Sequence, residues 1–310
     1  MNEFELIARL TRALPTNDSV VVGAGDDCAV LDVGAGDRLL LFKTDAVVEG
    51  VHFTNATPPE KVGRKALARC LSDIAAMAGT PTAAVITVGL PKQFNPVSVE
   101  KLYAGINALA KAHGVAIVGG ETTTNPERVF ISVALIGNVP REKVLLRSGA
   151  KAGDAIFVTG ELGGSIAGRH LEFEPRLLEA RWLAEHFPIH SMMDVSDGLA
   201  GDLRHILSAS NVGAELLRAA IPISRAARVL SKRGDAAKPA LVAALTDGED
   251  FELLFTVASK SAVPLLDAWK KQFRKLELSC IGKIVNGEGI KLRDETGVRP
   301  LHAHGYVHFS

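Results

Sequence analysis

Residues 192–203 read MMDVSDGLAGDL, a stretch in which a short apolar run, an acidic turn and the start of a helix follow one another. We expect a strand over residues 192–195 and a helix over residues 199–210. Asp194 and Asp197 put two like charges side by side in the turn, which proteins avoid unless a cation offsets the repulsion. The stretch therefore predicts a strand–turn–helix unit that presents carboxylates to a metal ion.

Five more acidic motifs are scattered along the chain, and most of them follow an apolar run that ends in Gly, Ser or Thr. A single acid is more often structural than functional; Asp73, for example, could pair with Arg69 one helical turn earlier. Together the acids predict one site for a hard divalent cation, most commonly Mg²⁺ held by carboxylates and substrate phosphates. The motifs are Gly25-Asp26-Asp27, Thr44-Asp45, Ser72-Asp73, Gly120-Glu121 and Gly248-Glu249-Asp250.

The apolar runs alternate between strand length and helix length in both halves of the chain. This mixture favours an α/β or α+β fold and leaves the order of the strands open. Residues 140–153 are rich in charges and turn formers, so we expect two domains, 1–140 and 141–310. The expected helices are 4–14, 58–79, 97–113, 175–187, 199–210 and 261–273, and the expected strands are 20–22, 39–42, 83–90, 115–118, 129–139, 155–159, 192–195, 251–257 and 276–285.

The bulk properties exclude several classes of protein. With 310 residues, 47% of them hydrophobic, the chain is long enough for two folded domains. Lys+Arg and Asp+Glu both number 35, so no global field would attract nucleic acid or an anionic membrane. No apolar run approaches the length that spans a bilayer, and the first ten residues do not resemble a signal peptide. Three widely spaced cysteines, Cys28, Cys70 and Cys280, argue against a disulfide framework, so we expect reduced core thiols and a cytoplasmic location.

The common phosphate-binding motifs are absent from the sequence. It contains no G-x-x-x-x-G-K-[ST] loop and no H-R-D or D-F-G set, which excludes a P-loop enzyme and a protein kinase. Residues 23–25 begin like a dinucleotide fingerprint, but two aspartates follow, so a Rossmann site is not expected. The glycine-rich turn at residues 158–165 and the threonines at residues 122–124 each allow two interpretations: a cradle for phosphate, or an ordinary turn with capping hydroxyls.

Nine motifs in the right order over nearly the whole chain together resemble thiamine-monophosphate kinase, a family of the aminoimidazole-ribonucleotide synthetase superfamily. No single motif would be sufficient. They are GDDCAV at 25–30, KTDAVVEGVHF at 43–53, CLSDIAAMAGTP at 70–81, VGGETT at 118–123, LLRSGAKAGD at 145–154, MMDVSDGLAGDL at 192–203, DGEDFELLFTV at 247–257, CIGKIV at 280–285 and GYVHF at 305–309.

The resemblance implies a fold, a reaction and a set of site residues. The fold would be a two-domain α/β arrangement whose N-terminal domain dimerises through its β-sheet, giving a homodimer. The reaction would be ATP-dependent phosphorylation of thiamine monophosphate to thiamine diphosphate with several Mg²⁺ ions, and a K⁺ requirement stays open. By matching motif, the metal ligands would be Asp27, Thr44, Asp45, Asp73, Glu121, Asp194 and Asp197, the ATP contacts Tyr103, Gly120, Glu121, Arg147 and Ser196, and the acceptor contacts His52, Glu249 and the position of Ala303.

The residue types agree with this chemistry. The acceptor is itself a phosphate, so its oxygen needs no general base to act as a nucleophile. Two polyanions must nevertheless meet in line, which requires cations, and Arg147 would add a fixed positive charge. Because no Ser/His/Asp or Cys/His nucleophile arrangement is evident, we predict direct phosphoryl transfer without a phosphoenzyme.

Three positions depart from the family pattern. Glu121 stands where G-G-D is usual, and its extra methylene moves the carboxylate outward by about 1.5 Å. Lys43 stands where a serine is common before the Thr-Asp pair, so its place among the metal-site residues is open, and its ammonium group could replace one metal ion. Ala303 falls where some members carry an aromatic residue that stacks on the thiamine ring.

Two alternatives follow from these departures. The first is another ATP-dependent enzyme of the superfamily: a selenophosphate synthetase, a ring-forming cycloligase or a carbamoyl-dehydrating maturation factor. A selenophosphate synthetase usually carries a reactive cysteine near its N terminus, and residues 1–22 contain none. The second is a non-catalytic dimer that binds nucleotide and has lost turnover. Glu121 and Lys43 are the residues that would support this alternative.

Overall fold

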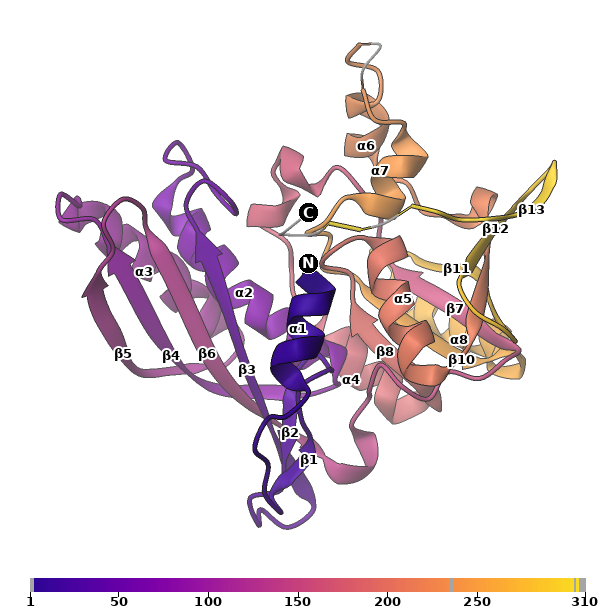
Figure 1. Ribbon diagram of the computed structural model, residues 1–310, viewed down its shortest axis with the longest axis horizontal. Helices are drawn as coiled ribbons and strands as arrows, with labels where there is room; N and C mark the ends of the chain where they lie inside the picture. Colours follow the sequence, from indigo (N-terminus) through magenta and orange to yellow (C-terminus); the bar gives the residue numbers. More distant parts are fainter. Residues whose placement is uncertain (1–2, 235–236, 304, 307–310) are drawn as a thin grey trace. The chain divides into compact units, whose positions relative to one another are not determined.

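The computed structural model describes residues 3–234, 237–303 and 305–306, and the chain divides into two compact units. The N-terminal unit comprises Asp18–Val144 and His170–Leu178, and the C-terminal unit comprises the chain up to Asn17, Leu145–Arg169 and the chain from Glu179 onward. One change of unit thus falls inside the predicted boundary at residues 140–153. The predicted ranges are contiguous, whereas the observed units exchange two short segments. Each unit contains its own β-sheet (Figure 1).

The N-terminal unit is built on a six-stranded sheet with the order β1-β2-β3-β6-β4-β5. Only β4 and β5 run parallel within it, and the other neighbours are antiparallel. Leu39 and Leu41 alternate with more exposed residues along β3, so one face of that strand is buried. The strands are β1 (Val20–Val22), β2 (Ala29–Leu31), β3 (Arg38–Val48), β4 (Thr80–Leu90), β5 (Ala116–Thr124) and β6 (Phe130–Pro140).

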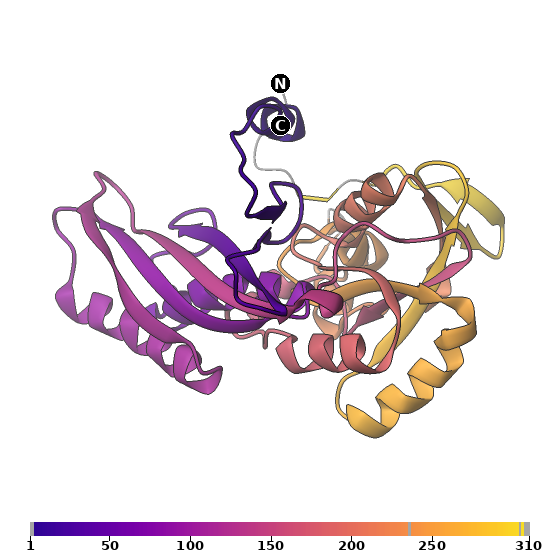
Figure 2. The same cartoon turned by 90° about the horizontal axis from the view of Figure 1, so that it is seen from below.

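Two long helices, α2 (Pro59–Ala76) and α3 (Pro96–Ala112), cover one face of this sheet (Figure 2). Both begin with proline, whose fixed φ suits the first helical position. They can approach closely because Gly63 has no side chain. A Cβ atom at this position would lie 1.9 Å from the carbonyl oxygen of Leu102. α2 ends at Ala76, three residues before the predicted stop, and Ala78 adopts a left-handed φ of 57°.

The opposite face of the sheet keeps large apolar side chains exposed. Phe42 on β3 and Ile136 on β6 are direct cross-strand partners with exposed fractions of 46% and 36%, and Val85 on β4 is 40% exposed. A sheet face of this composition is typical of an interface with another chain. We call it the open face.

The C-terminal unit contains a seven-stranded sheet with the order β13-β12-β9-β11-β7-β10-β8, in which only β9 and β12 run parallel. Its core includes the stacked rings of Phe157 and Phe255 and the buried face of the helix Leu199–Ser210. The strands are β7 (Asp154–Thr159), β8 (Ile189–Asp194), β9 (Gly213–Leu217), β10 (Leu253–Ala258), β11 (Leu278–Val285), β12 (Ile290–Asp294) and β13 (Gly297–Pro300). The helices are α1 (Glu3–Thr11), α4 (Leu177–His186), α5 (Leu199–Ser210), α6 (Arg225–Leu230), α7 (Ala240–Thr246) and α8 (Ser259–Gln272).

The structure contains elements that the sequence did not predict. β2, β9, β12, β13, α6 and α7 are short, and the alternation of apolar residues with charges in β12, IKLRD, is a strand pattern that the prediction overlooked. β3 and β5 are longer than predicted, so Thr44, Asp45 and Glu121 lie within strands and do not follow them. The three cysteines are free, and burial raises the pKa of the thiols of Cys28 and Cys70. Among the described residues, no helix is long and apolar enough to cross a membrane.

Candidate active site

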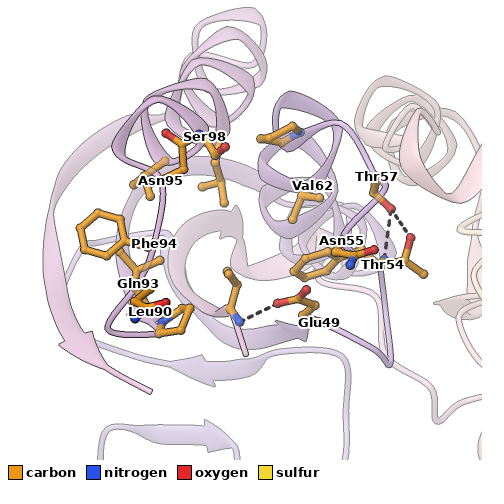
Figure 3. Close-up of a pocket in the computed structure, with 16 residues that line it drawn as sticks. Glu49, Thr54, Asn55, Thr57, Val62, Leu90, Gln93, Phe94, Asn95 and Ser98 are labelled. Carbon is orange, nitrogen blue, oxygen red and sulfur yellow. Dashed lines mark hydrogen bonds between the residues drawn. The ribbon is translucent and has the colours of Figure 1, made fainter. Parts of the chain in front are cut away.

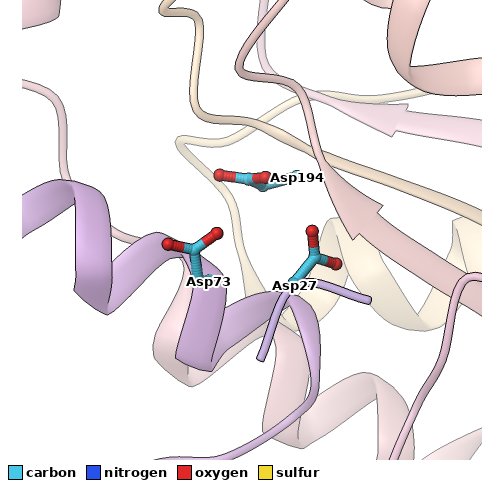
Figure 4. A group of neighbouring side chains, drawn as sticks. All are labelled: Asp27, Asp73 and Asp194. Carbon is cyan, nitrogen blue, oxygen red and sulfur yellow. The ribbon is translucent and has the colours of Figure 1, made fainter. Parts of the chain in front are cut away.

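Two buried carboxylates meet in the N-terminal unit. Asp27 lies between β1 and β2 and Asp73 in the last turn of α2; their exposed fractions are 1% and 7%, and they can bring oxygens within 4.8 Å of each other (Figure 4). Lys43 on β3 places Nζ 3.0 Å from Oδ1 of Asp73. Burial alone would lower the pKa of Lys43, but the charges of Asp73 and Asp45 outweigh it and hold this pKa above its usual range. A cation therefore already lies beside the carboxylate pair.

Asp45 is held by an arginine. Its Oδ2 accepts a hydrogen bond from Nε of Arg69 at 2.8 Å, and its Oδ1 accepts one from Nη2 at 3.2 Å. This bidentate pair links β3 to α2 and is stronger than a single neutral hydrogen bond. Asp73, which we considered as a possible partner of Arg69, forms an ion pair with Lys43. Metal coordination by Asp45 would therefore have to compete with Arg69.

Thr44 and Glu121 lie on the open face of the sheet, away from Asp45. Neighbours on a strand point to opposite faces, and Thr44 accordingly lies 3.4 Å from Ser132 on β6 by their hydroxyl oxygens. Glu121 on β5 pairs in register with Thr87, and Thr87 with Ser132. β6 and β4 separate β3 from β5, so three strand spacings, about 14 Å, lie between Asp45 and the Gly120-Glu121 pair. Within one chain these predicted ligands do not converge.

His52 lies in the turn after β3. Its Nδ1 accepts a hydrogen bond from the backbone N–H of Val48 at 3.1 Å. Tyr103, predicted to contact ATP, lies on α3 in the helical layer, and burial raises the pKa of its hydroxyl. The structure therefore places Tyr103 and Glu121 on opposite sides of the sheet.

A cavity of about 270 Å³ lies beside the His52 turn (Figure 3). Its lining is mostly apolar and uncharged polar, with Phe53, Leu90 and Phe94 among the apolar groups and Glu49 as the one charged residue. Because no described residue of its lining is a lysine or arginine, the cavity does not suit the phosphate groups of either substrate.

The opening motif of the sequence forms an acidic cluster in the C-terminal unit. Asp194 ends β8, and Asp202 in the first turn of α5 accepts a hydrogen bond through Oδ2 from the backbone N–H of Asp197 at 3.0 Å. Burial, followed by the charges of Asp197 and Asp194, raises the pKa of Asp202, while the charge of Arg147 opposes this shift. The charges of Asp194, Asp197 and Arg147 thus all act on Asp202. Asp202 was missed, although it stands in the same motif eight residues after Asp194.

The Glu249 loop packs against this cluster within the same unit. The N–H of Glu249 donates to the carbonyl oxygen of Ser196 at 2.7 Å, and the N–H of Phe251 donates to that of Val195 at 2.7 Å. Glu249 has a left-handed φ of 65°, which is costly for a residue with a side chain and is often found at functional sites. Ser196 and Glu249, predicted from separate motifs, are therefore neighbours.

The glycine-rich turn after β7 is closed by carboxylates. The N–H of Gly163 donates to Oδ2 of Asp250 at 2.7 Å, and that of Gly164 donates to Oδ2 of Asp247 at 3.0 Å. Asp250 also pairs with Arg169, whose Nη2 lies 2.7 Å from its Oδ1. Since these N–H groups are already bonded, the turn is structural, and the phosphate-cradle interpretation is not supported. The same bonds place Asp250 in the scaffold beneath Glu249.

Residues 305 and 306 lie against the start of α5. Ala303 is partly buried against the core of the C-terminal unit. Tyr306 is 49% exposed, and its N–H donates to the carbonyl oxygen of Asp197 at 2.8 Å. The aromatic residue beside the acidic cluster is therefore Tyr306, which belongs to the quoted GYVHF motif but was not assigned a role. Residues 307–309 of that motif lie outside the described residues.

The donor set of both units fits Mg²⁺. It consists of carboxylate oxygens, which Mg²⁺ prefers, and it includes no imidazole or thiolate. Asp27 with Asp73, and Asp194 with Asp197 and Asp202, are groups of like charges that a divalent cation would stabilise.

Comparison with known families identifies both halves of the chain. Residues 25–139 match the family described as AIR synthase related protein, N-terminal domain, and residues 151–295 match AIR synthase related protein, C-terminal domain. The hydrogenase maturation protein HypE of Escherichia coli has the same fold, with a TM-score of 0.72 over 97% of both chains at 21% identity. The chain is thus a two-domain protein of the AIR synthase class, which confirms the predicted fold.

Closer relatives define the family within this class. Thiamine-monophosphate kinase of Rhodopirellula baltica is 38% identical and covers 96% of this chain and 93% of its own length. A solved structure described as AaThiL complexed with AMPPCP and TMP has a TM-score of 0.79 at 30% identity, covering 99% of this chain and 97% of its own. The chain belongs to the thiamine-monophosphate kinase family, as the sequence motifs indicated.

Proposed function

We propose that this protein transfers the γ-phosphoryl group of ATP to thiamine monophosphate and forms thiamine diphosphate. Family membership over nearly the whole chain supports this reaction. The observation in the structure that carries it best is the buried carboxylate pair Asp27 and Asp73, two like charges that can bring oxygens within 4.8 Å of each other and that a divalent cation would stabilise.

The metal ligands of this proposal are Asp27 and Asp73 in the N-terminal unit and Asp194 and Asp197 in the C-terminal unit. Mg²⁺ bound to them would offset the charge of the transferred phosphoryl group and of the acceptor phosphate. Lys43 takes the place of one such cation, because its ammonium group already pairs with Asp73. Asp202 orients Asp197 by accepting a hydrogen bond from the backbone N–H of Asp197.

Substrate contacts come from the remaining predicted residues. Arg147, whose charge opposes the rise in the pKa of Asp202, binds the phosphates of ATP. Ser196 also contacts ATP. His52 and Glu249 contact the acceptor. Tyr306 takes the stacking role in place of Ala303, since this residue is half exposed and its backbone N–H bonds to the carbonyl oxygen of Asp197. Transfer is direct, because the acceptor oxygen needs no activating base and no protein nucleophile is used.

The protein functions as a homodimer through the open face in this proposal. The exposed Phe42, Val85 and Ile136 support such an interface. Dimerisation would also explain the position of Glu121, which lies on the open face about 14 Å from Asp45 of the same chain. The Gly120-Glu121 pair then serves the site of the partner subunit, and Thr44 lies at the interface. A cytoplasmic location stays a prediction from the sequence.

An assay of product formation tests the function. Purified protein is incubated with Mg-ATP and thiamine monophosphate, and thiamine diphosphate is measured by chromatography against an ATP-only blank and an EDTA blank. The proposal expects product in the complete mixture and in neither blank. ATP binding without product would favour a non-catalytic dimer, for which the Lys43–Asp73 pair is the specific observation. Replacing K⁺ by Na⁺ in the same assay decides whether K⁺ is required.

A further inference from the structure

Lys65 on α2 is a fully buried lysine, with an exposed fraction of 0%. Burying an ammonium group is costly unless hydrogen bonds replace its water. Its Nζ donates to the backbone carbonyl oxygen of His52 at 2.8 Å and lies 2.8 Å from Nδ1 of His170. The side chain therefore joins the His52 turn to a segment more than a hundred residues later in the sequence.

The proton positions on both imidazoles follow from this geometry. An ammonium group can only donate, so Nδ1 of His170 must accept, and its ring is neutral with the proton on Nε2. Nδ1 of His52 accepts from the N–H of Val48, so its ring is also neutral and carries its proton on Nε2. His52 thereby presents an N–H donor, which suits a phosphate oxygen.

The segment that contains His170 is itself bonded to α2. Nη1 of Arg64 donates to the carbonyl oxygen of Phe173 at 2.6 Å, and Nζ of Lys61 lies 2.8 Å from Oε1 of Glu172. All these residues belong to the N-terminal unit. His170 therefore holds the ammonium group of Lys65 in place, and Lys65 in turn holds the backbone of the His52 turn.

We propose that Lys65, anchored by His170, is a positioning residue that holds His52 in the orientation in which its Nε2–H contacts the acceptor phosphate. This rests on the proposed function, which assigns His52 to the acceptor. Lys65 touches neither substrate and acts only through the backbone of the turn.

The test is a double-mutant cycle on the KM for thiamine monophosphate. Lys65→Met alone and His52→Ala alone should each raise this KM by about tenfold, while the KM for ATP stays within about twofold. In the His52→Ala background, Lys65→Met should add nothing, because its route of action is gone. An equal further rise in that background would overturn the proposal.

A second pair of variants keeps the proposal testable if Lys65→Met fails to fold. His170→Gln retains an acceptor for Nζ and should keep the KM near that of the unchanged protein, whereas His170→Leu removes the acceptor and should raise it. Equal KM values for the two would contradict the proposal. Lys61→Met is the matched control, because it removes another lysine of the same helix whose ion pair with Glu172 is exposed and contributes little, and it should leave the KM unchanged.

The outcome separates this proposal from the proposed function. If His52→Ala leaves the KM unchanged while thiamine diphosphate is still formed, His52 does not contact the acceptor, and the role of Lys65 falls with that assignment. If the unchanged protein forms no thiamine diphosphate, the proposed function itself fails in the product assay.

Discussion

Nζ of Lys43 lies 3.0 Å from Oδ1 of Asp73, so a lysine side chain supplies a positive charge beside the carboxylate pair of Asp27 and Asp73. The charges of Asp73 and Asp45 keep this lysine protonated by raising its pKa. The pair thus carries less uncompensated negative charge than two aspartates alone would. This arrangement should reduce the dependence of the folded protein on Mg²⁺.

Lys43→Ser should make stability depend on Mg²⁺. Without the ammonium group, Asp27 and Asp73 repel each other, so the melting temperature in EDTA should fall and then recover in Mg²⁺ by linkage. An opposite charge at this distance changes the protonation or cation-binding equilibrium of a carboxylate by about tenfold or more. Thermal melts of both proteins, with Lys61→Ser as a surface control, measure this. An identical Mg²⁺-induced shift in the variant and the unchanged protein would contradict the prediction.

Asp73→Asn and Asp45→Asn should differ in their effect on stability. Asp73→Asn should lower kcat by about a hundredfold, because Asp73 is a proposed metal ligand. Asp45→Asn should instead cost on the order of 1–2 kcal/mol of unfolding free energy, since it breaks the bidentate pair with partly buried Arg69. Urea unfolding and initial rates on the same samples measure the two effects. If Asp73→Asn unfolds the protein while Asp45→Asn does not, the roles are reversed.

The sequence predicted the long elements and the chemistry of the acids because both are local properties. The helix at residues 58–79 and the turn at residues 194–197 follow from spacing and from adjacent like charges. What the sequence could not give is the face on which a side chain lies. Thr44 and Asp45 are neighbours in one motif, yet the pleat of β3 sends them to opposite sides of the sheet.

Long-range pairing was equally out of reach. Arg69 is four residues from Asp73, so the sequence suggested only that local pairing as a structural alternative, whereas tertiary packing brings Asp45 of β3 to the guanidinium of Arg69. The buried Lys65 gave no signal either, since a lone lysine in a helical pattern normally lies at the surface. The role of Asp202 was visible only in the fold, because it depends on the N–H of Asp197.

Mixed dimers should recover activity if Glu121 serves the partner subunit. Asp73→Asn and Glu121→Gln chains should each form inactive homodimers. After unfolding and refolding together, about a quarter of the sites should combine an unchanged Asp73 with an unchanged Glu121, because half the dimers are mixed and each carries one intact site. Asp27→Asn mixed with Asp73→Asn is the control and should stay inactive. A mixture of the first two chains without activity would mean that Glu121 acts within its own chain.

Tyr306→Ala should weaken acceptor binding. Loss of a stacking ring costs up to about 1.5 kcal/mol, so the KM for thiamine monophosphate should rise up to about tenfold, with the KM for ATP unchanged. Tyr306→Phe keeps the ring and should behave like the unchanged protein. Steady-state kinetics with each substrate varied in turn distinguish the variants. If Tyr306→Phe is as impaired as Tyr306→Ala, the hydroxyl group and not the ring is what matters.

Asp250→Asn should flatten the pH dependence of stability. Burial, which outweighs the charge of Arg169, raises the pKa of Asp250 to about 7. The folded protein therefore binds a proton that the unfolded chain has released above its ordinary pKa of about 4. Between these values the unfolded state holds fewer protons, so this group makes stability fall as the pH rises from about 4 to about 7, by up to about 1.4 kcal/mol per pH unit. Above pH 7 both states are ionised and the contribution is constant.

Urea unfolding at pH 5, 6, 7 and 8 should show this slope in the unchanged protein and a shallower slope in Asp250→Asn. Asp247→Asn is the control and should keep the slope, because Asp247 also accepts a hydrogen bond from a glycine of the same turn. Equal slopes in all three proteins would place the pKa of Asp250 near its ordinary value and its carboxylate in the charged form throughout.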